Sequence, residues 1–184
     1  MSHKAIILAA GKGKRLGSET SGVPKVMRLA NGRPLLSYVV DALNLPPCDV
    51  IIVAGYMRER VIAEFPGHPI AVQEHQLGTA DAVKSALPLL QGFKGDVIVC
   101  CGDMPLVRRE SYAALSKLHS LKGNDATILT GTYPRQMPMG RIVRSPDDSF
   151  ERIVEAKDSD AELDKIREYN SGIYVFRKIA LESS

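Results

Sequence analysis

The sequence has no apolar run long enough to cross a bilayer and no biased composition. Its first apolar run extends only from Ala5 to Ala10, whereas a membrane span needs roughly 20 apolar residues. That run is also too short for a secretory signal. Glycine and proline, at 15 and 11 of 184 residues, are too few for a collagen-like or low-complexity chain. We therefore expect a cytoplasmic protein of one domain that has no membrane partner.

Cysteine and net charge are low as well. Three cysteines are an odd number, which excludes a fully paired disulfide framework. No cysteine or histidine pair has zinc-finger spacing, so we expect buried core thiols and histidines at the surface. The 24 Lys and Arg residues oppose 21 Asp and Glu residues. The resulting net charge of +3 gives no reason to expect a nucleic-acid partner.

Three short apolar runs, each ending at a glycine, are the clearest structural pattern. They are Ala5–Ala10, Val50–Ala54 and Asp96–Cys101. Runs of this length suit parallel strands that are covered on both faces. Segments with helical spacing lie between them, so strands and helices alternate along the chain. The pattern predicts an α/β fold, with an open, mainly parallel, Rossmann-like sheet and helices on both faces.

The expected helices follow from apolar residues at helical spacing. Residues 36–43 follow Arg33-Pro34, which suits a helix start. Residues 83–90 repeat the spacing, and Thr79 is the expected N-cap of that helix. A third helix is expected around Tyr112, Leu115 and Leu118. After residue 121 the pattern changes, because three segments are strand-like without long helices between them: 126–133, 140–144 and 169–176.

A cation-rich glycine loop follows the first apolar run. It reads Gly-Lys-Gly-Lys-Arg-Leu from Gly11 to Leu16, and Pro24-Lys25 comes after it. Glycines let backbone N–H groups approach an anion closely. The cations Lys12, Lys14, Arg15 and Lys25 would add positive charge around that anion. The loop favours a phosphate site, with a solvated basic turn as the alternative.

This loop differs from the better-known nucleotide loops. The pattern G-x-x-x-x-G-K-[ST] is absent, which argues against a P-loop NTPase. A third glycine is missing at Leu16, and the loop is too cationic for a dinucleotide fingerprint. No kinase motif set occurs either.

Two further polar stretches follow predicted strands. Asp103 comes just after the third apolar run, where a carboxylate could hold a hard divalent cation such as Mg²⁺. The stretch from Gln73 to Thr79 joins an amide side chain, a glycine and a helix start. An amide both donates and accepts hydrogen bonds, which suits the edge of a base such as uracil. A turn aspartate and an ordinary polar loop are the alternatives.

Six stretches, in order, resemble the sugar-1-phosphate nucleotidyltransferases. The closest resemblance is to the uridyltransferase domain of the bacterial bifunctional N-acetylglucosamine-1-phosphate uridyltransferase/glucosamine-1-phosphate acetyltransferases, and it covers nearly the whole chain. The stretches are Leu8 to Leu16 with Pro24-Lys25, Gln73 to Thr79, Gly102 to Leu106, Gly140 to Ile142, Val154 to Asp158 and Asn170 to Tyr174.

The resemblance implies a role for each matching residue. Arg15 and Lys25 would be the catalytic cations on the phosphates, and Asp103 the ligand of Mg²⁺, the implied cofactor. Residues 1–121 would form a nucleotide-binding part and residues 122–184 a sugar-binding part. The implied nucleotide-binding residues are Leu8, Ala10, Gly11, Gly13, Gln73, Gly78 and Thr79. The implied sugar-binding residues are Gly140, Glu155 and Asn170.

The implied reaction is transfer of a uridylyl group from UTP to N-acetylglucosamine-1-phosphate, giving UDP-N-acetylglucosamine and pyrophosphate. The sequence shows no Ser-His or Cys-His pair, and none is needed because a sugar phosphate is already an anionic nucleophile. Two alternatives stay open. One is the same chemistry on a glucose- or mannose-type sugar phosphate with UTP, dTTP, GTP or CTP. The other is a nucleotide-sugar-binding module without turnover. Small-molecule substrates are the expected partners in each case.

The sequence departs from the family pattern in four places. Lys14 stands where Thr or Ser is usual, and Cys101 stands where the closest relatives carry Tyr. The segment from Gly17 to Val23 is longer by a few residues. The chain also stops at Ser184, before the family's second metal ligand, an Asn, and its closing elements. We therefore expect a C-terminally short domain with low activity, whose uncovered apolar surface favours a homo-oligomer.

Overall fold

The computed structural model describes residues 2–11 and 22–183, and the chain divides into two compact units. The first unit comprises Met1–Thr127 together with Val175–Ser184, and the second comprises Ile128–Tyr174. The boundary expected at residue 121 stays a prediction. Across the described ranges, no helix combines the length and apolar character that a transmembrane span requires.

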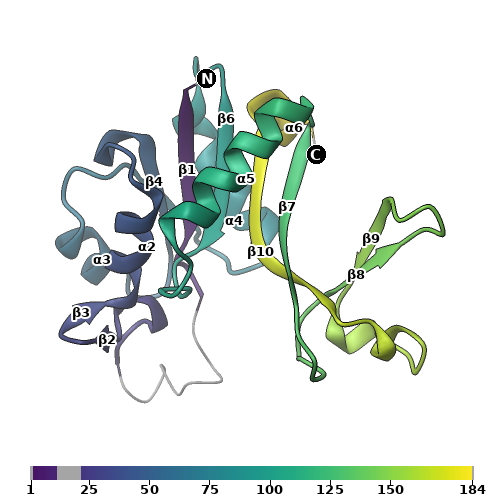
Figure 1. Cartoon of the computed structure of the whole chain (residues 1–184). Helices are drawn as coiled ribbons and strands as arrows, with labels where there is room; N and C mark the ends of the chain where they lie inside the picture. Colours follow the sequence, from purple (N-terminus) through teal and green to yellow (C-terminus); the bar gives the residue numbers. More distant parts are fainter. Residues whose placement is uncertain (1, 12–21, 184) are drawn as a thin grey trace. The chain divides into compact units, whose positions relative to one another are not determined.

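Four parallel strands form the core of the first unit: β1 (His3–Leu8), β4 (Val50–Ala54), β5 (Ile70–Val72) and β6 (Asp96–Cys101). Figure 1 shows β1 between β4 and β6, and β5 pairs with β4 on the other side. All of β4 and most of β6 are buried. Strands covered on both faces have continuous apolar runs, which is why the sequence revealed them. The expected α/β fold with a mainly parallel sheet is confirmed.

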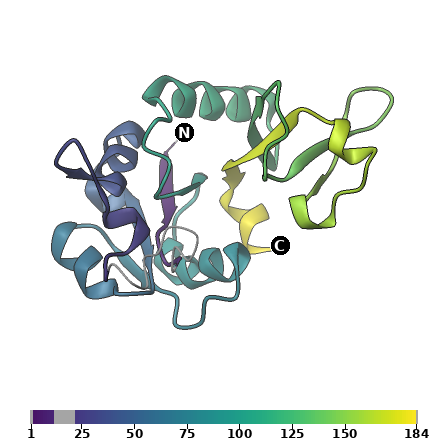
Figure 2. The ribbon, with the colours of Figure 1, turned by 90° about the horizontal axis from the view of Figure 1, so that it is seen from below.

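Helices cover both faces of this sheet: α2 (Leu35–Leu43), α3 (Arg58–Glu64), α4 (Thr79–Ala86) and α5 (Arg109–Lys122). α5 packs against α2, whereas α4 packs against β1, β4 and β5. Figure 2 shows α4 and α5 on opposite sides of the sheet. The C-cap residues of α2 and α5 are Asn44 and Gly123, and both have the left-handed conformation that is common at helix ends.

The remaining elements of the first unit are short. β2 (Leu29–Ala30) and β3 (Arg33–Pro34) form a small antiparallel pair, and α6 (Lys178–Glu182) follows the last strand. Single 3₁₀ turns occupy Lys25–Met27, Pro47–Asp49 and Leu87–Leu90.

The parallel register brings the carboxyl ends of the strands to one edge. Leu8 pairs with Val53 on one side and with Cys101 on the other, and Ala54 pairs with Val72. The residues that follow these strands therefore meet at the same edge of the sheet. In open α/β sheets this is the edge at which ligands bind.

The buried face of α5 differs from the expected one. Leu118 was expected inside but is 46% exposed, whereas His119 is only 1% exposed. Residue 119 lies seven positions after Tyr112, so it returns to the same side of the helix. The expectation of surface histidines is therefore wrong for His119, whose Nδ1 lies 2.9 Å from Thr127 Oγ1.

Two smaller expectations also need correction. Cys100 is buried and Cys101 half-buried, but Cys48 is exposed, so a core position does not describe all three thiols. Gly78 rather than Thr79 is the N-cap of α4. Gly78 has a φ of 124°, a backbone conformation that glycine adopts without a steric penalty, and the chain therefore enters the helix one residue earlier.

The second unit is antiparallel. β8 (Arg141–Arg144) pairs with β9 (Phe150–Val154) on one side and with β10 (Glu168–Arg177) on the other, and β7 (Ala126–Thr132) also pairs with β10. β7 and β10 each have residues in both units, so they carry the chain between them. The strands expected after residue 121 are confirmed with small shifts of their ends. Single 3₁₀ turns at Ala156–Asp158 and Leu163–Lys165 lie between β9 and β10.

Candidate active site

A cavity of about 370 Å³ opens at the carboxyl edge of the sheet in the first unit. Its wall comes from the ends of β1 and β6, from the segment after β5, from the start of α4 and from the 3₁₀ turn Lys25–Met27. The lining residues are Leu8, Ala9, Ala10, Gly11, Lys25, Val26, Gln73, Gln76, Gly78, Thr79, Ala82, Cys101 and Asp103.

Most residues expected to bind nucleotide or metal share this cavity. Gly11, Gly78 and Asp103 line it together, as expected from their positions after apolar strands. Gly13 and Arg15 lie outside the described residues. The roles assigned to the lining residues stay predictions. The expected residues that line the cavity are Leu8, Ala10, Gly11, Lys25, Gln73, Gly78, Thr79 and Asp103.

Backbone packing fixes the floor of the cavity. Ala9 donates its N–H to Val53 O at 2.9 Å, and Gly102 donates to Leu8 O at 3.0 Å. A Cβ on Gly55 would lie 2.9 Å from the Ala10 Cβ, so a larger residue there would push the floor inward. A Cβ on Gly11 would instead meet no described atom within 4 Å. The Gly11 backbone is therefore open to a ligand, as a phosphate contact requires.

Gln73 holds the segment that leads into α4. It is 4% exposed, and its Nε2 donates to Gly78 O at 3.1 Å and to Asp81 Oδ2 at 2.7 Å. Both amide N–H groups are therefore engaged within the protein, and the side-chain oxygen is left as an acceptor. Gln73 was expected both to donate to a base and to accept from it, but only its side-chain oxygen is left for a ligand. Its amide nitrogen instead binds Gly78 and Asp81 at the start of α4.

Gln76 also lines the cavity and was not singled out from the sequence. Its side chain is exposed, and its Nε2 donates to Gln73 O at 3.3 Å, which leaves its side-chain oxygen and one N–H available. An exposed amide with both functions suits a base edge better than Gln73 does. Gln76 belongs to a motif that resembles the family's, but its exposure was not readable from that motif.

Lys25 and Asp103 form an ion pair inside the cavity. Their side chains are 36% and 25% exposed, so each can be reached by a ligand. From the sequence, Lys25 was expected to bind phosphate and Asp103 to bind a divalent cation, and the ion pair joins these two side chains.

The described residues offer few ligands for a divalent metal. Within the described ranges, no cluster of three or more His, Cys, Asp or Glu residues could hold an ion. Asp103 contributes one accessible carboxylate at the cavity wall. Mg²⁺ is commonly held by one or two carboxylates, with water and substrate phosphates completing its shell. The residues present therefore fit a metal that arrives with nucleotide rather than a metal held by protein alone.

Among the described residues of the cavity wall, the half-buried Cys101 is the one that carries a thiol. Burial, with a smaller contribution from the charge of Asp103, raises the pKa of Cys101 to about 11. The thiol is therefore protonated at neutral pH, and a protonated thiol is a poor nucleophile. No histidine is among the described residues of the wall. The cavity thus offers charge and backbone donors rather than a covalent nucleophile.

The three residues expected to bind sugar lie close together in the second unit. Gly140 O accepts the backbone N–H of Asn170 at 2.8 Å. A Cβ on Gly140 would lie 3.5 Å from Glu155 Oε1 and 3.0 Å from Ile153 Cγ2. The Glu155 carboxyl therefore lies beside the Gly140 backbone, and Glu155 is exposed.

Asn170 is oriented by its own strand. Its Nδ2 donates to Tyr174 Oη at 2.6 Å, and its Oδ1 accepts from the Gly172 N–H at 2.9 Å. Gly172 has a φ of 76°, which favours glycine and lets β10 bend back to this oxygen. One N–H and one lone pair of the Asn170 amide stay available for a polar ligand.

The chain is similar to known proteins over nearly its whole length. The family described as "MobA-like NTP transferase domain" matches residues 5–171. Proteins named "Bifunctional protein GlmU" match from Pelotomaculum thermopropionicum, with 41% identity over 183 residues, and from Bacillus velezensis, with 40% over 179 residues. These alignments cover 98% and 96% of this chain but only 39% of each relative.

A solved structure shares the fold. It is described as a glucose-1-phosphate thymidylyltransferase from Bacillus anthracis in complex with a sucrose. The TM-score is 0.76 at 19% sequence identity, over 98% of this chain and 74% of the other. The resemblance inferred from the six motifs is confirmed by these matches. The chain belongs to the MobA-like NTP transferase domain family.

Proposed function

We propose that the protein transfers a uridylyl group from UTP to N-acetylglucosamine-1-phosphate, giving UDP-N-acetylglucosamine and pyrophosphate. The observation that carries the proposal is the single cavity in which Gly11, Lys25, Gln76 and Asp103 meet at the carboxyl edge of the sheet. It combines open backbone, a cation, a base-reading amide and a carboxylate. The relatives named GlmU, which are about 40% identical to the chain over the aligned residues, support this choice of substrates.

The reaction needs no covalent enzyme intermediate. An oxygen of the sugar phosphate attacks the α-phosphorus of UTP, a new P–O bond forms, and the bond to the β-phosphate oxygen breaks. The nucleophile is already an anion, so no proton has to be removed. This agrees with a cavity wall whose described residues include no histidine and whose Cys101 thiol is protonated.

The chain's own residues act by position and charge. The open backbone at Gly11 faces the phosphates, and Lys25 moves from Asp103 to a phosphate oxygen, which reduces repulsion between the two anions. A divalent cation held by Asp103 would supply further neutralisation of the phosphates and of the leaving pyrophosphate. Gly13 and Arg15 stay expected contributors.

Gly140, Glu155 and Asn170 are the proposed sugar contacts. Glu155 offers an exposed carboxylate, and Asn170 a partly engaged amide, which together suit hydroxyl groups and the amide of an N-acetyl sugar. We further place the reaction in the cytoplasm, with small-molecule substrates as partners and homo-oligomer formation as an open prediction.

One specific observation supports a second candidate. The neighbour that shares the fold is described as a glucose-1-phosphate thymidylyltransferase. Pyrophosphate release should therefore be measured with UTP, dTTP, GTP and CTP, each against N-acetylglucosamine-, glucose- and mannose-1-phosphate. Highest release with UTP and the N-acetyl sugar, lost in Asp103→Asn, supports the proposal. Higher release with dTTP and glucose-1-phosphate would contradict it, and UTP binding without turnover on any pair would indicate a binding module.

A further inference from the structure

Arg141 is the largest fully buried side chain of the second unit. It is 2% exposed, although it directly follows Gly140 in a small antiparallel sheet. Its Nη2 donates to Asp164 Oδ1 at 2.7 Å, and its Nη1 donates to Met139 O at 3.1 Å. Its guanidinium also lies 6.0 Å from the centre of the Tyr169 ring. Its Nε has no hydrogen-bond partner within residues 2–11 and 22–183.

Burying an arginine in this way costs desolvation free energy, which suggests that the residue has a structural or functional role. A buried charge loses hydration that one ion pair only partly replaces. Asp164 is 39% exposed, so this partner reaches Arg141 from the surface. An apolar residue at position 141 would fill the same space without the desolvation cost. The contacts of Arg141 therefore point to a positioning role.

Asp164 connects Arg141 to the segment that follows Glu155. Its Oδ1 accepts from Ser159 Oγ at 2.7 Å as well as from Arg141. These two interactions, the Ser159 hydrogen bond first, lower the pKa of Asp164, so the carboxylate stays charged at neutral pH. Asp160 begins the same turn by accepting the backbone N–H of Leu163 at 2.8 Å. With the hydrogen bond from the Asp158 N–H to Glu155 O at 3.0 Å, these contacts link residues along the segment 155–164.

The same arginine also contacts the segment that precedes Gly140. Arg141 binds the Met139 carbonyl, and Tyr169 Oη accepts the Met137 N–H and donates to Arg135 O, both at 3.3 Å. Arg141 therefore lies between two loops, one ending at Gly140 and one beginning at Glu155. These are two of the three residues to which sugar contacts are assigned.

We propose that Arg141 and Asp164 form a clamp that positions Gly140 and Glu155 for the sugar phosphate. The proposal rests on the proposed function, because it assumes that these residues bind the sugar. Neither clamp residue needs to touch substrate. Their effect is to set the distance between the Gly140 backbone and the Glu155 carboxyl, whose Oε1 lies 3.5 Å from where a Cβ on Gly140 would be.

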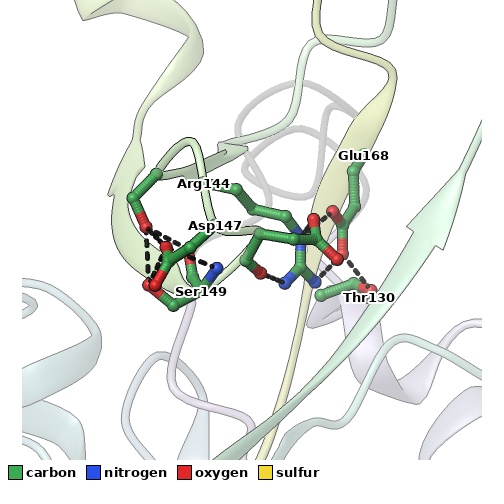
Figure 3. Close-up of polar contacts among 7 residues, drawn as sticks. Thr130, Arg144, Asp147, Ser149 and Glu168 are labelled. Carbon is green, nitrogen blue, oxygen red and sulfur yellow. Dashed lines mark hydrogen bonds and ion pairs between the residues drawn. The ribbon is translucent and has the colours of Figure 1, made fainter.

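The same strand supplies a matched control. Arg144, three residues further along β8, binds both carboxylate oxygens of Glu168 at 2.8 and 2.9 Å, and Thr130 Oγ1 donates to the same carboxylate at 2.7 Å. Figure 3 shows this contact beside the turn of Asp147 and Ser149. It is also an arginine–carboxylate pair of the second unit, but it makes no contact with Gly140 or Glu155 among the described residues.

The test compares Asp164→Asn with Glu168→Gln, since each replaces the carboxylate of one arginine pair by an amide of the same shape. We expect Asp164→Asn to raise the KM for N-acetylglucosamine-1-phosphate by about tenfold, as loss of a supporting partner does at other sites. The KM for UTP and the kcat should stay within about twofold, and Glu168→Gln should resemble the unchanged protein. Ser159→Ala, which removes one bond to Asp164, should shift the KM in the same direction even if Asp164→Asn folds poorly.

The outcomes separate this clamp from the proposed function. If the unchanged protein turns over the sugar phosphate and both carboxylate variants show the same KM values, the clamp is overturned while the function stands. If the unchanged protein neither turns over nor binds any sugar phosphate in saturation-transfer NMR, the function is overturned and the clamp with it. Partial rescue of the sugar KM by Arg141→Lys, compared with Arg141→Met, supports the clamp further.

Discussion

Replacing Lys25 by methionine tests the electrostatics of the cavity most directly. Lys25 pairs with Asp103, the proposed metal ligand, when no nucleotide is bound. Methionine keeps much of the length of the side chain but removes its charge. Asp103 would then lose a competitor for the metal, and an incoming divalent cation would lose a neighbour of like charge. We therefore expect Lys25→Met to bind Mg²⁺ or Mn²⁺ alone more tightly than the unchanged protein.

The size of the effect follows from the exposure of the pair. With side chains 36% and 25% exposed, water screens the interaction, and pairs of this kind contribute about 0.2–1 kcal/mol. An energy of about 1 kcal/mol changes an equilibrium constant by about fivefold. Metal affinity without nucleotide should therefore rise by about 1.4- to fivefold. Turnover should fall by about 10²–10³-fold, since a charge that stabilises the transition state is lost.

Calorimetric titration with Mn²⁺ and pyrophosphate release with Mg²⁺ measure the two effects. Lys25→Arg is the control, because it keeps the positive charge and should keep the metal affinity of the unchanged protein. Asp103→Asn should bind no metal in the cavity. The reasoning is refuted if Lys25→Met binds Mn²⁺ no more tightly than Lys25→Arg, or if Asp103→Asn binds Mn²⁺ as well as the unchanged protein does. A melting temperature close to that of the unchanged protein is expected for Lys25→Met, since the removed charge is partly exposed.

Three further predictions follow from glycine geometry and from one buried histidine. Gly140→Ala should raise the KM for the sugar phosphate without changing that for UTP, because its Cβ would lie only 3.0 Å from Cγ2 of Ile153, two residues before Glu155; equal changes in both KM values would contradict this. Gly78→Ala should lower the melting temperature by the equivalent of about 1 kcal/mol, since its φ of 124° disfavours any side chain; an unchanged melting curve would argue against it. Burial lowers the pKa of His119 below its ordinary 6.5, so the folded protein keeps it neutral and stability is lost as the pH falls through 6.5 toward the folded value. Melting temperatures between about pH 8 and pH 5.5 should therefore fall less in His119→Gln than in the unchanged protein, and parallel curves would refute this.

The fold of the first unit was predictable because its strands are buried on both faces. β4 has five buried residues in sequence and β6 has five of six. Such runs need no alternation to be recognised, and each ends at a glycine where the chain leaves the sheet. From parallel strands alone it follows that Gly11, Gly78 and Asp103 meet at one edge, and the cavity there has all three on its wall.

Contacts between distant side chains were not predictable from local patterns. Arg141 pairs with Asp164, 23 residues away, and Lys25 with Asp103 across the cavity. In the sequence each of these residues is an ordinary charged residue near a turn. Which charge meets which depends on strand register and on the course of the loops, and neither is encoded in the spacing of one segment.

Sequence by itself determined the family, the parallel sheet and the edge at which the site lies, because each depends on short apolar runs and glycine turns that are local properties of the chain. Tertiary structure alone decided which polar groups are free to act. It engages the Gln73 amide with Gly78 and Asp81, leaves Gln76 exposed, and buries His119 where Leu118 was expected. The physical reason is that burial and hydrogen-bond partners are fixed by neighbours brought together in space, so the availability of a side chain is a property of the packed molecule.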